Sequence, residues 1–284
     1  MNRNFDLLLT AIAPAIWGST YLVTTQLLPA GYPLTVAMLR ALPAGLLLLL
    51  IVRRLPHGVW WLLFISAYRL PGGVAATVGA VQPLIVIVLA RLLLGSPIRG
   101  LSIIAAIAGI GGVALLILTP NATLDPIGIA AGIAGAFSMA AGTVLSRRWR
   151  PDVSPLTFTA WQLTAGGVLL LPVALLLEPP LPHLTGANVL GFAYLGLIGA
   201  ALTYILWFRG LSRLEPSMVS PLGFLSPTTA VILGWAVLGQ QLSPMQMFGI
   251  VVVLGSVWLS QRAQQAPTAG NPMLGGSQAV TSKQ

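Results

Sequence analysis

Cysteine is absent from the 284-residue sequence, and histidine and charged residues are scarce. Without thiols the chain can form neither disulfides nor thiolate metal sites. His57 and His183, the only histidines, each lie next to proline in a predicted loop, so we expect no metal ion and no other cofactor. Charged residues make up 7% of the chain, against about 25% in soluble domains, which is too few to cover a soluble surface. The composition therefore predicts a membrane protein.

Acidic residues are the scarcest charged type. All five lie in predicted termini or loops: Asp6, Asp125, Asp152, Glu178 and Glu215. A pump driven by protons or sodium usually needs a carboxylate inside a membrane span, to bind the ion or relay the proton. The chain also has no glycine-rich phosphate-binding loop of the P-loop type. These absences disfavour pumps driven by an ion gradient or by ATP.

Enzyme motifs are missing as well. A membrane-embedded enzyme needs a set of reactive side chains, such as an HExxH motif or paired carboxylates inside the membrane, and the sequence has neither. The formal net charge of +9 raises the question of a nucleic-acid partner. However, the arginines come in ones and twos at the ends of apolar runs, and no basic stretch is interleaved with aromatic residues. That distribution suits lipid headgroups, so we expect the lipid bilayer as a partner and no nucleic acid.

The chain contains much of its sequence twice. Residues 206–259 repeat residues 62–115 at a constant offset of 144 positions, with no gap. A second block, PLTVAMLRALPAG from Pro33, repeats as PLTFTAWQLTAGG from Pro155, at an offset of 122 positions. A duplicated apolar sequence of this kind predicts a transporter built from two halves.

Ten apolar runs follow one another along the chain. They are 7–28, 33–53, 59–69, 73–94, 99–118, 127–148, 155–177, 187–209, 216–239 and 244–261. A helix needs about 20 residues to cross about 30 Å of hydrocarbon, and most of these runs reach that length. We therefore expect an all-α polytopic membrane protein with two five-helix repeats, 1–118 and 127–262. The polar stretch 263–284 is expected to be a disordered cytoplasmic tail.

The third run is too short to cross a bilayer. Residues 59–69 form a helix of about 16 Å, which is half a bilayer. The two repeat offsets differ by 22 positions, and the difference arises between Gly45 and Leu62. Either this span is a genuine half-helix or residues are missing from the sequence. We favour missing residues, because this stretch cannot supply both the end of the second span and a full third crossing.

The positions of the basic residues predict the topology. Ten spans place both termini on one side, and with those termini inside, the outer loops carry only Arg69 while nearly all other basic residues lie inside. Both termini are therefore expected to be cytoplasmic. Because each half has an odd number of spans, the second half must be inverted relative to the first.

Several motifs in order resemble one family. They are WGSTY in the first span, Arg40 in the second, FSMAAGTVLSRR in the sixth, and an LG…G…G pattern after the fourth and ninth spans. Together they resemble the EamA family of the drug/metabolite transporter superfamily, over nearly the whole chain up to Arg262. Within it, the YddG-type exporters of aromatic amino acids are the most similar kind. The resemblance implies a monomeric, multi-pass exporter in a bacterial inner membrane.

Two departures from the family pattern limit what the resemblance implies. Family members often carry an acidic residue directly after the LG pair, but those positions are Ser96 and Gln240 here. A tryptophan often found in the sixth span is replaced by Met139, so an aromatic role cannot be assigned to that position.

Arg40 is the one ionisable residue well inside a predicted span. A charge at that depth is costly. It either snorkels outward or caps backbone carbonyls, or it faces a cavity and attracts an anionic group such as a carboxylate. The equivalent position in the second half is Gln162, which is neutral but still forms hydrogen bonds.

Other candidate site residues are aromatic, small and polar, or proline. Trp17 and Trp161 lie inside their spans beside small polar groups, although most membrane tryptophans are interfacial. Pro83 and Pro227 lie at matching positions of the repeat, where proline either breaks the helix or simply kinks it. The predicted substrate site comprises Trp17, Ser19, Arg40, Gln82, Pro83, Trp161, Gln162, Tyr204, Phe224, Ser226 and Pro227.

These features favour an exporter of aromatic and other neutral amino acids and related small metabolites. Aromatic walls with a few hydrogen-bonding groups suit amphipathic organic solutes. Without an intramembrane carboxylate, we expect facilitated diffusion or exchange through alternating access. The alternatives are a drug or nucleotide-sugar carrier of the same superfamily, a membrane-embedded enzyme, and a scaffold that transports nothing.

Overall fold

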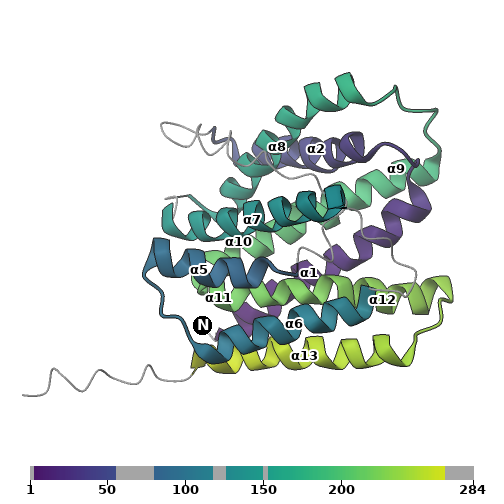
Figure 1. Ribbon diagram of the computed structural model, residues 1–284. Coiled ribbons are helices and arrows are strands. Elements are labelled where there is room, and N and C mark those ends of the chain that lie inside the picture. The colour runs from purple at the N-terminus through teal and green to yellow at the C-terminus, as the bar shows by residue number, and fades with distance from the viewer. Residues whose placement is uncertain (1–2, 56–79, 118–125, 150–152, 266–284) are drawn as a thin grey trace, which may run out of the picture.

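The computed structural model describes residues 3–55, 80–117, 126–149 and 153–265, and every regular element in these ranges is helical. The helices lie side by side, most of them roughly parallel or antiparallel to one another (Figure 1). The expectation of an all-helical protein is confirmed for this part of the chain. The predicted third span, 59–69, falls outside the described residues.

The helices begin and end close to the predicted limits. The single helices are α1 (Arg3–Leu27), α2 (Pro33–Val52), α5 (Gln82–Leu94), α6 (Gly100–Ile117), α7 (Pro126–Trp149), α8 (Pro155–Leu177) and α13 (Pro244–Gln265). Two predicted spans consist of consecutive pieces. The first is α9 (Gly186–Ala193), the π-helix η1 (Tyr194–Leu202) and α10 (Thr203–Arg213); the second is α11 (Pro216–Val219), the 3₁₀-helix η2 (Ser220–Phe224) and α12 (Leu225–Leu238).

Proline and glycine set many of these boundaries. Proline occupies the first turn of α2, α5, α8 and α11, where its missing N–H leaves no intrahelical bond unmade. Gly95 and Gly239 end α5 and α12 in the left-handed region, at φ 70° and 66°. Glycine adopts that conformation without steric strain, so each helix stops at its glycine.

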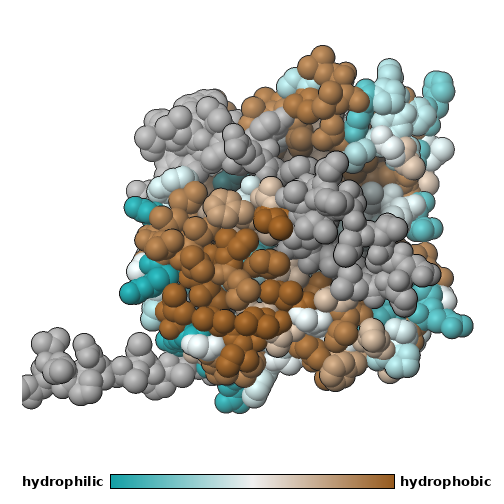
Figure 2. All heavy atoms as spheres, viewed as in Figure 1, coloured by the Kyte–Doolittle hydropathy of each residue, from teal (hydrophilic) through white to brown (hydrophobic). Residues whose placement is uncertain are grey.

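Six helical stretches among the described residues are long and apolar enough to cross a membrane. They are Arg3–Leu27, Pro33–Val52, Pro155–Leu177, Gly186–Arg213, Pro216–Leu238 and Pro244–Gln264. Large apolar side chains remain exposed on them, for example Leu50, Leu176 and Phe248. Hydrophobic side chains cover the face over α5 and α6, while many hydrophilic ones lie toward the margins (Figure 2). The chain is therefore a multi-pass membrane protein.

Two terminal expectations need correction. The first helix starts earlier than the predicted residue 7: α1 begins at Arg3, and Asp6, expected in a terminus or loop, lies in its first turn and is only 6% exposed. The tail was expected to begin at residue 263, but α13 continues to Gln265 and buries Ala263. In both cases a polar group at the helix end interacts with a neighbouring helix. The spacing of residues along the sequence does not predict such a contact.

The two matching prolines each lie shortly after residues that are not α-helical. Residues 80 and 81 form a turn before α5 begins at Gln82, so the predicted span 73–94 is not one continuous helix. The 3₁₀-helix η2 precedes α12, whose third residue is Pro227. Of the two alternatives for these prolines, the 3₁₀-helix before α12 fits a local break at Pro227, whereas the residues before position 80 lie outside the described ranges and a break at Pro83 stays a prediction. Each proline lies in the first turn of its helix.

Helices α2 and α8 pack closely and antiparallel. A Cβ added at Gly45 would overlap the backbone of Thr164, and one added at Gly167 would overlap the backbone of Leu42. The repeat offset of 122 positions converts one contact into the other, since it carries Gly45 to Gly167 and Leu42 to Thr164. The contact is thus reciprocal, as expected for a pair related by a two-fold axis across the helices.

Polar contacts fix both ends of the α2–α8 pair. Glu178, just after α8, accepts hydrogen bonds from the backbone N–H groups of Leu34 (2.6 Å) and Thr35 (2.7 Å). Burial raises the pKa of this carboxyl, but the hydrogen bonds from Thr35 and Leu34 outweigh burial and hold the pKa below its ordinary value. At the opposite end, Nε1 of Trp161 donates to the backbone carbonyl of Arg54 at 2.7 Å.

Helix α1 packs against α12 and α10, while α5 packs against α7. A Cβ added at Gly18 would overlap the carbonyl oxygen of Ser226, so α1 and α12 touch through their backbones. Gly210 lets α10 approach Thr10 of α1 in the same way. Helix α1 is therefore held between α10 on one side and α12 on the other.

Candidate functional site

A chain of hydrogen bonds joins α1, α2 and the η1–α10 junction. Nε1 of Trp17 donates to Oγ1 of Thr203 at 2.9 Å, and this hydroxyl donates to the carbonyl oxygen of Gly199 at 2.9 Å. Nη2 of Arg40 donates to the same carbonyl at 2.9 Å. Trp17 and Arg40 are half-buried, while Thr203 is fully buried. We refer to Arg40, Gly199, Thr203 and Trp17 as the Arg40–Trp17 network.

The π-helix η1 explains why a backbone carbonyl is available there. In a π-helix the hydrogen bonds span five residues, so its turns are wider than those of an α-helix, and such segments are frequent at functional sites. Tyr194, the first residue of η1, shares a 2.6 Å hydrogen bond with the hydroxyl of Ser19. Gly199 also lets Thr20 approach closely. The residues of η1 therefore contact the middle of α1 at two points.

An aromatic row runs beside this network. The ring of Trp17 lies 5.1 Å from Trp207 and 5.6 Å from Tyr204, measured between centroids. Tyr204 stacks on Phe208 at 5.9 Å, and Phe208 meets Phe158 edge-on at 4.8 Å. The row takes its rings from α1, α10 and α8. Trp17 belongs to both the row and the network, and its hydrogen bond to Thr203 fixes its ring orientation.

Arg40 caps a backbone carbonyl, which is one of the two roles expected for it. Among the described residues no carboxylate pairs with it. Its guanidinium therefore supplies positive potential beside η1 that no described carboxylate offsets. An ionisable residue inside a span makes this place a candidate for a functional site.

A second set of predicted site residues lies at the starts of α5 and α12. It contains Gln82 and Pro83 at the start of α5, and Ser226 and Pro227 at the start of α12. Ser226 contacts Gly18 through its carbonyl oxygen, next to Trp17 in the chain. The structure therefore places Ser226 against the middle of α1, one residue along the chain from Trp17.

Three predicted residues lie elsewhere or point elsewhere. Trp161 is 4% exposed and bonds the carbonyl of Arg54 beyond the end of α2, so it does not share the contacts of Trp17. Gln162 is half-buried beside it. Phe224 is 2% exposed and packs against Gly109 of α6 within a hydrophobic core cluster. The sequence indicated that these side chains lie inside spans, but not which neighbour each one faces.

Ion pairs gather at one end of the bundle, which we call the charged end. The carboxylate of Asp6 lies 2.7 Å from Arg209 and 3.4 Å from Arg213. Arg147, at the end of α7, donates to the carbonyl oxygen of Ser212 at 2.5 Å. It also lies 3.8 Å from Glu215. These contacts tie the start of α1 and the end of α7 to the end of α10.

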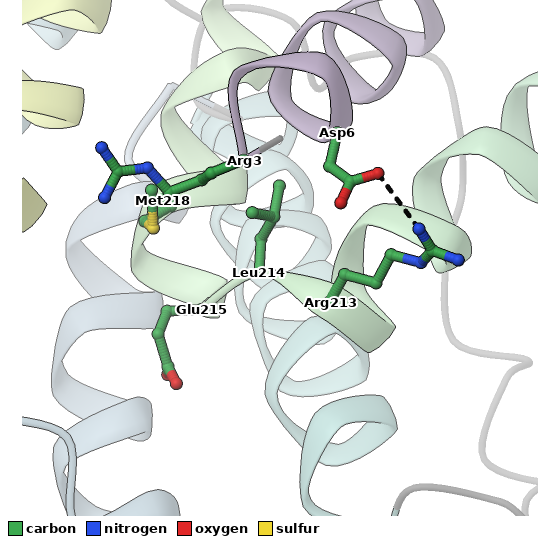
Figure 3. A pocket seen from close by; sticks show the side chains of 6 residues that line it. All are labelled: Arg3, Asp6, Arg213, Leu214, Glu215 and Met218. Carbon is green, nitrogen blue, oxygen red and sulfur yellow. Dashed lines mark hydrogen bonds and ion pairs between the residues drawn. The ribbon is translucent and has the colours of Figure 1, made fainter. Parts of the chain in front are cut away.

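A cavity of about 320 Å³ lies among these charges. Its lining residues are Arg3, Asp6, Arg213, Leu214, Glu215 and Met218. Figure 3 shows Asp6 and Arg213 pointing toward each other, while Glu215 points away from that pair. No predicted site residue lines it. Within the described ranges, no group of three His, Asp or Glu residues is arranged to hold a metal ion.

Sequence reasoning missed Thr203, Tyr194 and Gly199. The neighbouring Tyr204 was predicted, but a single threonine in an apolar run gives no signal of its own. The GAALTY segment, in which small residues precede Thr203, could have indicated a close approach to another helix.

Comparison with known proteins identifies the class and then the family. The EamA-like transporter family matches residues 126–261. The chain is 45% identical to Protein PecM of Dickeya dadantii over 266 residues, covering 88% of this chain and 90% of that protein. It is 28% identical to the uncharacterized inner membrane transporter YedA of Escherichia coli K12, covering 86% of each. A solved crystal structure shares the fold, with a TM-score of 0.78 at 19% identity, covering 93% of this chain and all of that one.

The helical membrane fold and these similarities define a membrane transporter of the drug/metabolite transporter superfamily. Within that superfamily, the chain belongs to the EamA family. The resemblance identified from the sequence motifs is thereby confirmed at the level of the family.

Proposed function

We propose that this chain exports neutral amino acids, aromatic ones among them, and related small metabolites across a bacterial inner membrane. The observation that carries the proposal is the aromatic row beside the Arg40–Trp17 network. Rings at 4.8–5.9 Å spacing form an apolar wall, and one uncompensated guanidinium supplies positive potential beside it. Such a combination suits a solute with an apolar side chain and a carboxylate.

Alternating access between two inverted five-helix repeats, 1–118 and 127–262, is the proposed transport cycle. The reciprocal contacts of Gly45 and Gly167 support this arrangement, because an antiparallel pair with a two-fold relation has its axis in the membrane plane. The packing of α1 on α12 and of α7 on α5 supports it as well, since these pairs occupy corresponding places in the two repeats. With this topology, the charged end faces the cytoplasm and the protein acts as a monomer.

The proposed substrate site lies beside the middle of α1. Trp17, Tyr204 and Ser19 form its wall, and Arg40 lies toward its outer mouth. Gln82 and Ser226, with their prolines, form its floor. Trp17→Ala removes a large ring face, and a lost contact of about 1 kcal/mol lowers affinity about five-fold, more for bulky than for small solutes.

The gradient of the solute itself is the proposed driving force, either by facilitated diffusion or by exchange. None of the acidic residues in the described helices lies in the middle of a span: Asp6 is in the first turn of α1, and Glu178 and Glu215 follow helix ends. Net downhill flux should therefore persist without a proton or sodium gradient.

Reconstitution into liposomes with a panel of labelled solutes tests the proposal. The panel contains amino acids, a nucleotide sugar and a cationic drug, each measured with and without ion gradients. Uptake of neutral amino acids, competed by aromatic ones and independent of ion gradients, is the expected result. If only the nucleotide sugar or the drug is transported, the proposed substrate class is wrong and a carrier of that solute is favoured. If no solute is transported, a scaffold is favoured.

A further inference from the structure

Two buried hydrogen-bond donors next to η2 have no partner. Gln82 is 5% exposed and Ser220 is 0% exposed. Within the described part of the chain, neither Nε2 of Gln82 nor Oγ of Ser220 forms a hydrogen bond. Buried polar groups in proteins are nearly always satisfied, so an orphaned pair in one region points to a missing ligand.

Both donors lie on the same side of η2. In a 3₁₀-helix, side chains three residues apart lie one above the other, so Ser220 and Gly223 share a face. Among the described residues outside the local backbone, one heavy atom lies within 4 Å of a Cβ added at Gly223, namely Oε1 of Gln82 at 3.8 Å. The carboxamide of Gln82 thus lies beside open space at Gly223, on the face that carries Ser220.

The N-terminus of α5 contributes a positive electrostatic potential beside Gln82. Gln82 is the first residue of α5, a helix of 13 residues, and it directly follows a turn at residues 80 and 81. The N-terminus of a helix carries partial positive charge and favours anionic groups. The surrounding side chains are apolar, including Ala80, Leu222 and Phe224, all at least nine-tenths buried.

We propose that Gln82, Ser220 and the N-terminus of α5 bind the carboxylate of the transported solute. This inference rests on the proposed function and assigns one end of its substrate. Nε2 of Gln82 donates to one carboxylate oxygen, and Oγ of Ser220 donates to the other. Arg40 acts at a distance through its charge, because its guanidinium already holds the carbonyl of Gly199.

The test compares solutes that differ only in the carboxylate. The parent and the variants Gln82→Leu and Ser220→Ala are reconstituted, and counterflow of labelled leucine or phenylalanine is competed with each amino acid and with its decarboxylated amine, isoamylamine or phenethylamine. Each variant should lower the apparent affinity of the amino acid about ten-fold, as expected when a hydrogen bond to a charged group is lost. The affinity of the amine should stay within two-fold, roughly the error of such an assay.

Matched variants separate a lost ligand from a damaged fold. Ser220→Thr keeps a hydroxyl and should retain the preference for the amino acid. Ser256→Ala removes a buried serine hydroxyl whose partner is the carbonyl of Val253, and it should leave the preference unchanged.

Three outcomes overturn the inference. If the affinities of amino acid and amine fall in parallel, or if neither falls, the donors do not bind the carboxylate. If Ser220→Ala raises thermal stability without changing selectivity, the pair holds only water. If the parent transports the amines but no carboxylate-bearing solute, the proposed function fails together with this subsite, whereas the first two results leave the proposed function standing.

Discussion

Helix α1 is held at its start and at its middle by different kinds of interaction. At the charged end, Asp6 binds two guanidinium groups, those of Arg209 and Arg213. In the middle, Trp17 is held by a neutral hydrogen bond to Thr203 and by ring contacts. Water can replace ion pairs near a membrane surface, but it cannot easily replace hydrogen bonds in an apolar interior. The charged end is therefore suited to opening during transport, and the middle of α1 to holding a fixed geometry.

The largest effect should follow from Asp6→Asn. The side chain of Asp6 is 8% exposed and that of Arg209 is 20% exposed, so the variant leaves a half-buried guanidinium without its counter-charge. Breaking a fully buried pair costs about 3–5 kcal/mol, so for this partly exposed pair we expect about 3 kcal/mol at most. The charged end should then open more often, and Met218→Cys, which lines the cavity, should react faster with a membrane-impermeant maleimide. The chain has no native cysteine, so the label reports one position.

Glu215→Gln is the matched control. Its carboxylate lies 3.8 Å from Arg147 and is 50% exposed, so this ion pair contributes little. Equal labelling rates in the two variants would show that the Asp6 pairs do not hold the charged end closed.

The next effect concerns two adjacent glycines of α8. Gly167→Ala places a methyl group against the backbone of Leu42, which cannot move without shifting α2. We expect a loss of about 1–3 kcal/mol in stability. Gly166→Ala meets no atom of a described residue beyond its own helix backbone within 4 Å, so it should be neutral or slightly stabilising. Thermal unfolding in detergent measures both, and similar melting temperatures would argue against the close α2–α8 contact.

Thr203→Val tests how much the hydroxyl of Thr203 contributes to the middle of α1. Valine keeps the shape of threonine but removes the hydroxyl that accepts from Trp17 and donates to Gly199. We expect a loss of about 1 kcal/mol, or about five-fold weaker substrate binding, with most of the protein still folded. Counterflow with aromatic amino acids measures the change. Thr228→Val, which removes a buried hydroxyl bonded to the carbonyl of Phe224, serves as the control and should affect substrate binding less.

The smallest effect should come from Glu178. Its folded-state pKa lies below the ordinary value, so its stabilising contribution is fully present above the unfolded-state pKa and is lost as the pH falls through the folded-state pKa. A carboxylate at a helix N-terminus contributes about 0.3–1 kcal/mol. Glu178→Gln should remove this acid-side loss of stability and should lower stability at neutral pH by no more than that amount. An identical acid profile in parent and variant would show that other groups cause the loss.

Individual helices show which features of the fold the sequence predicted and which it did not. The limits of α8 were predicted to the residue, because an apolar run between Pro155 and Glu178 marks them directly. The π-helix η1 was not predicted, since its apolar run looks like that of any α-helix. The π-helical geometry depends on contacts with α1 and α2, which lie more than 140 positions away in the sequence.

The sequence predicted individual residues of the candidate site but not the contacts between them. Trp17 and Arg40 were singled out because large aromatic or charged groups are unusual inside a span. Their shared partners, Thr203 and Gly199, were missed, because a threonine and a glycine in an apolar run are common. Asp6 was taken for part of a polar terminus, because its partners lie on α10, over 200 positions later.

The sequence by itself determined that this chain crosses a membrane, where most of its helices begin and end, and which family it belongs to. These properties follow from local composition, from proline and glycine at helix ends, and from motif order. The tertiary structure decided which polar groups meet: Arg40 with the carbonyl of Gly199, Asp6 with Arg209, and Trp17 with Thr203. The reason is physical, because a buried polar or charged group must find its partner on a neighbouring helix, and helix packing fixes that partner.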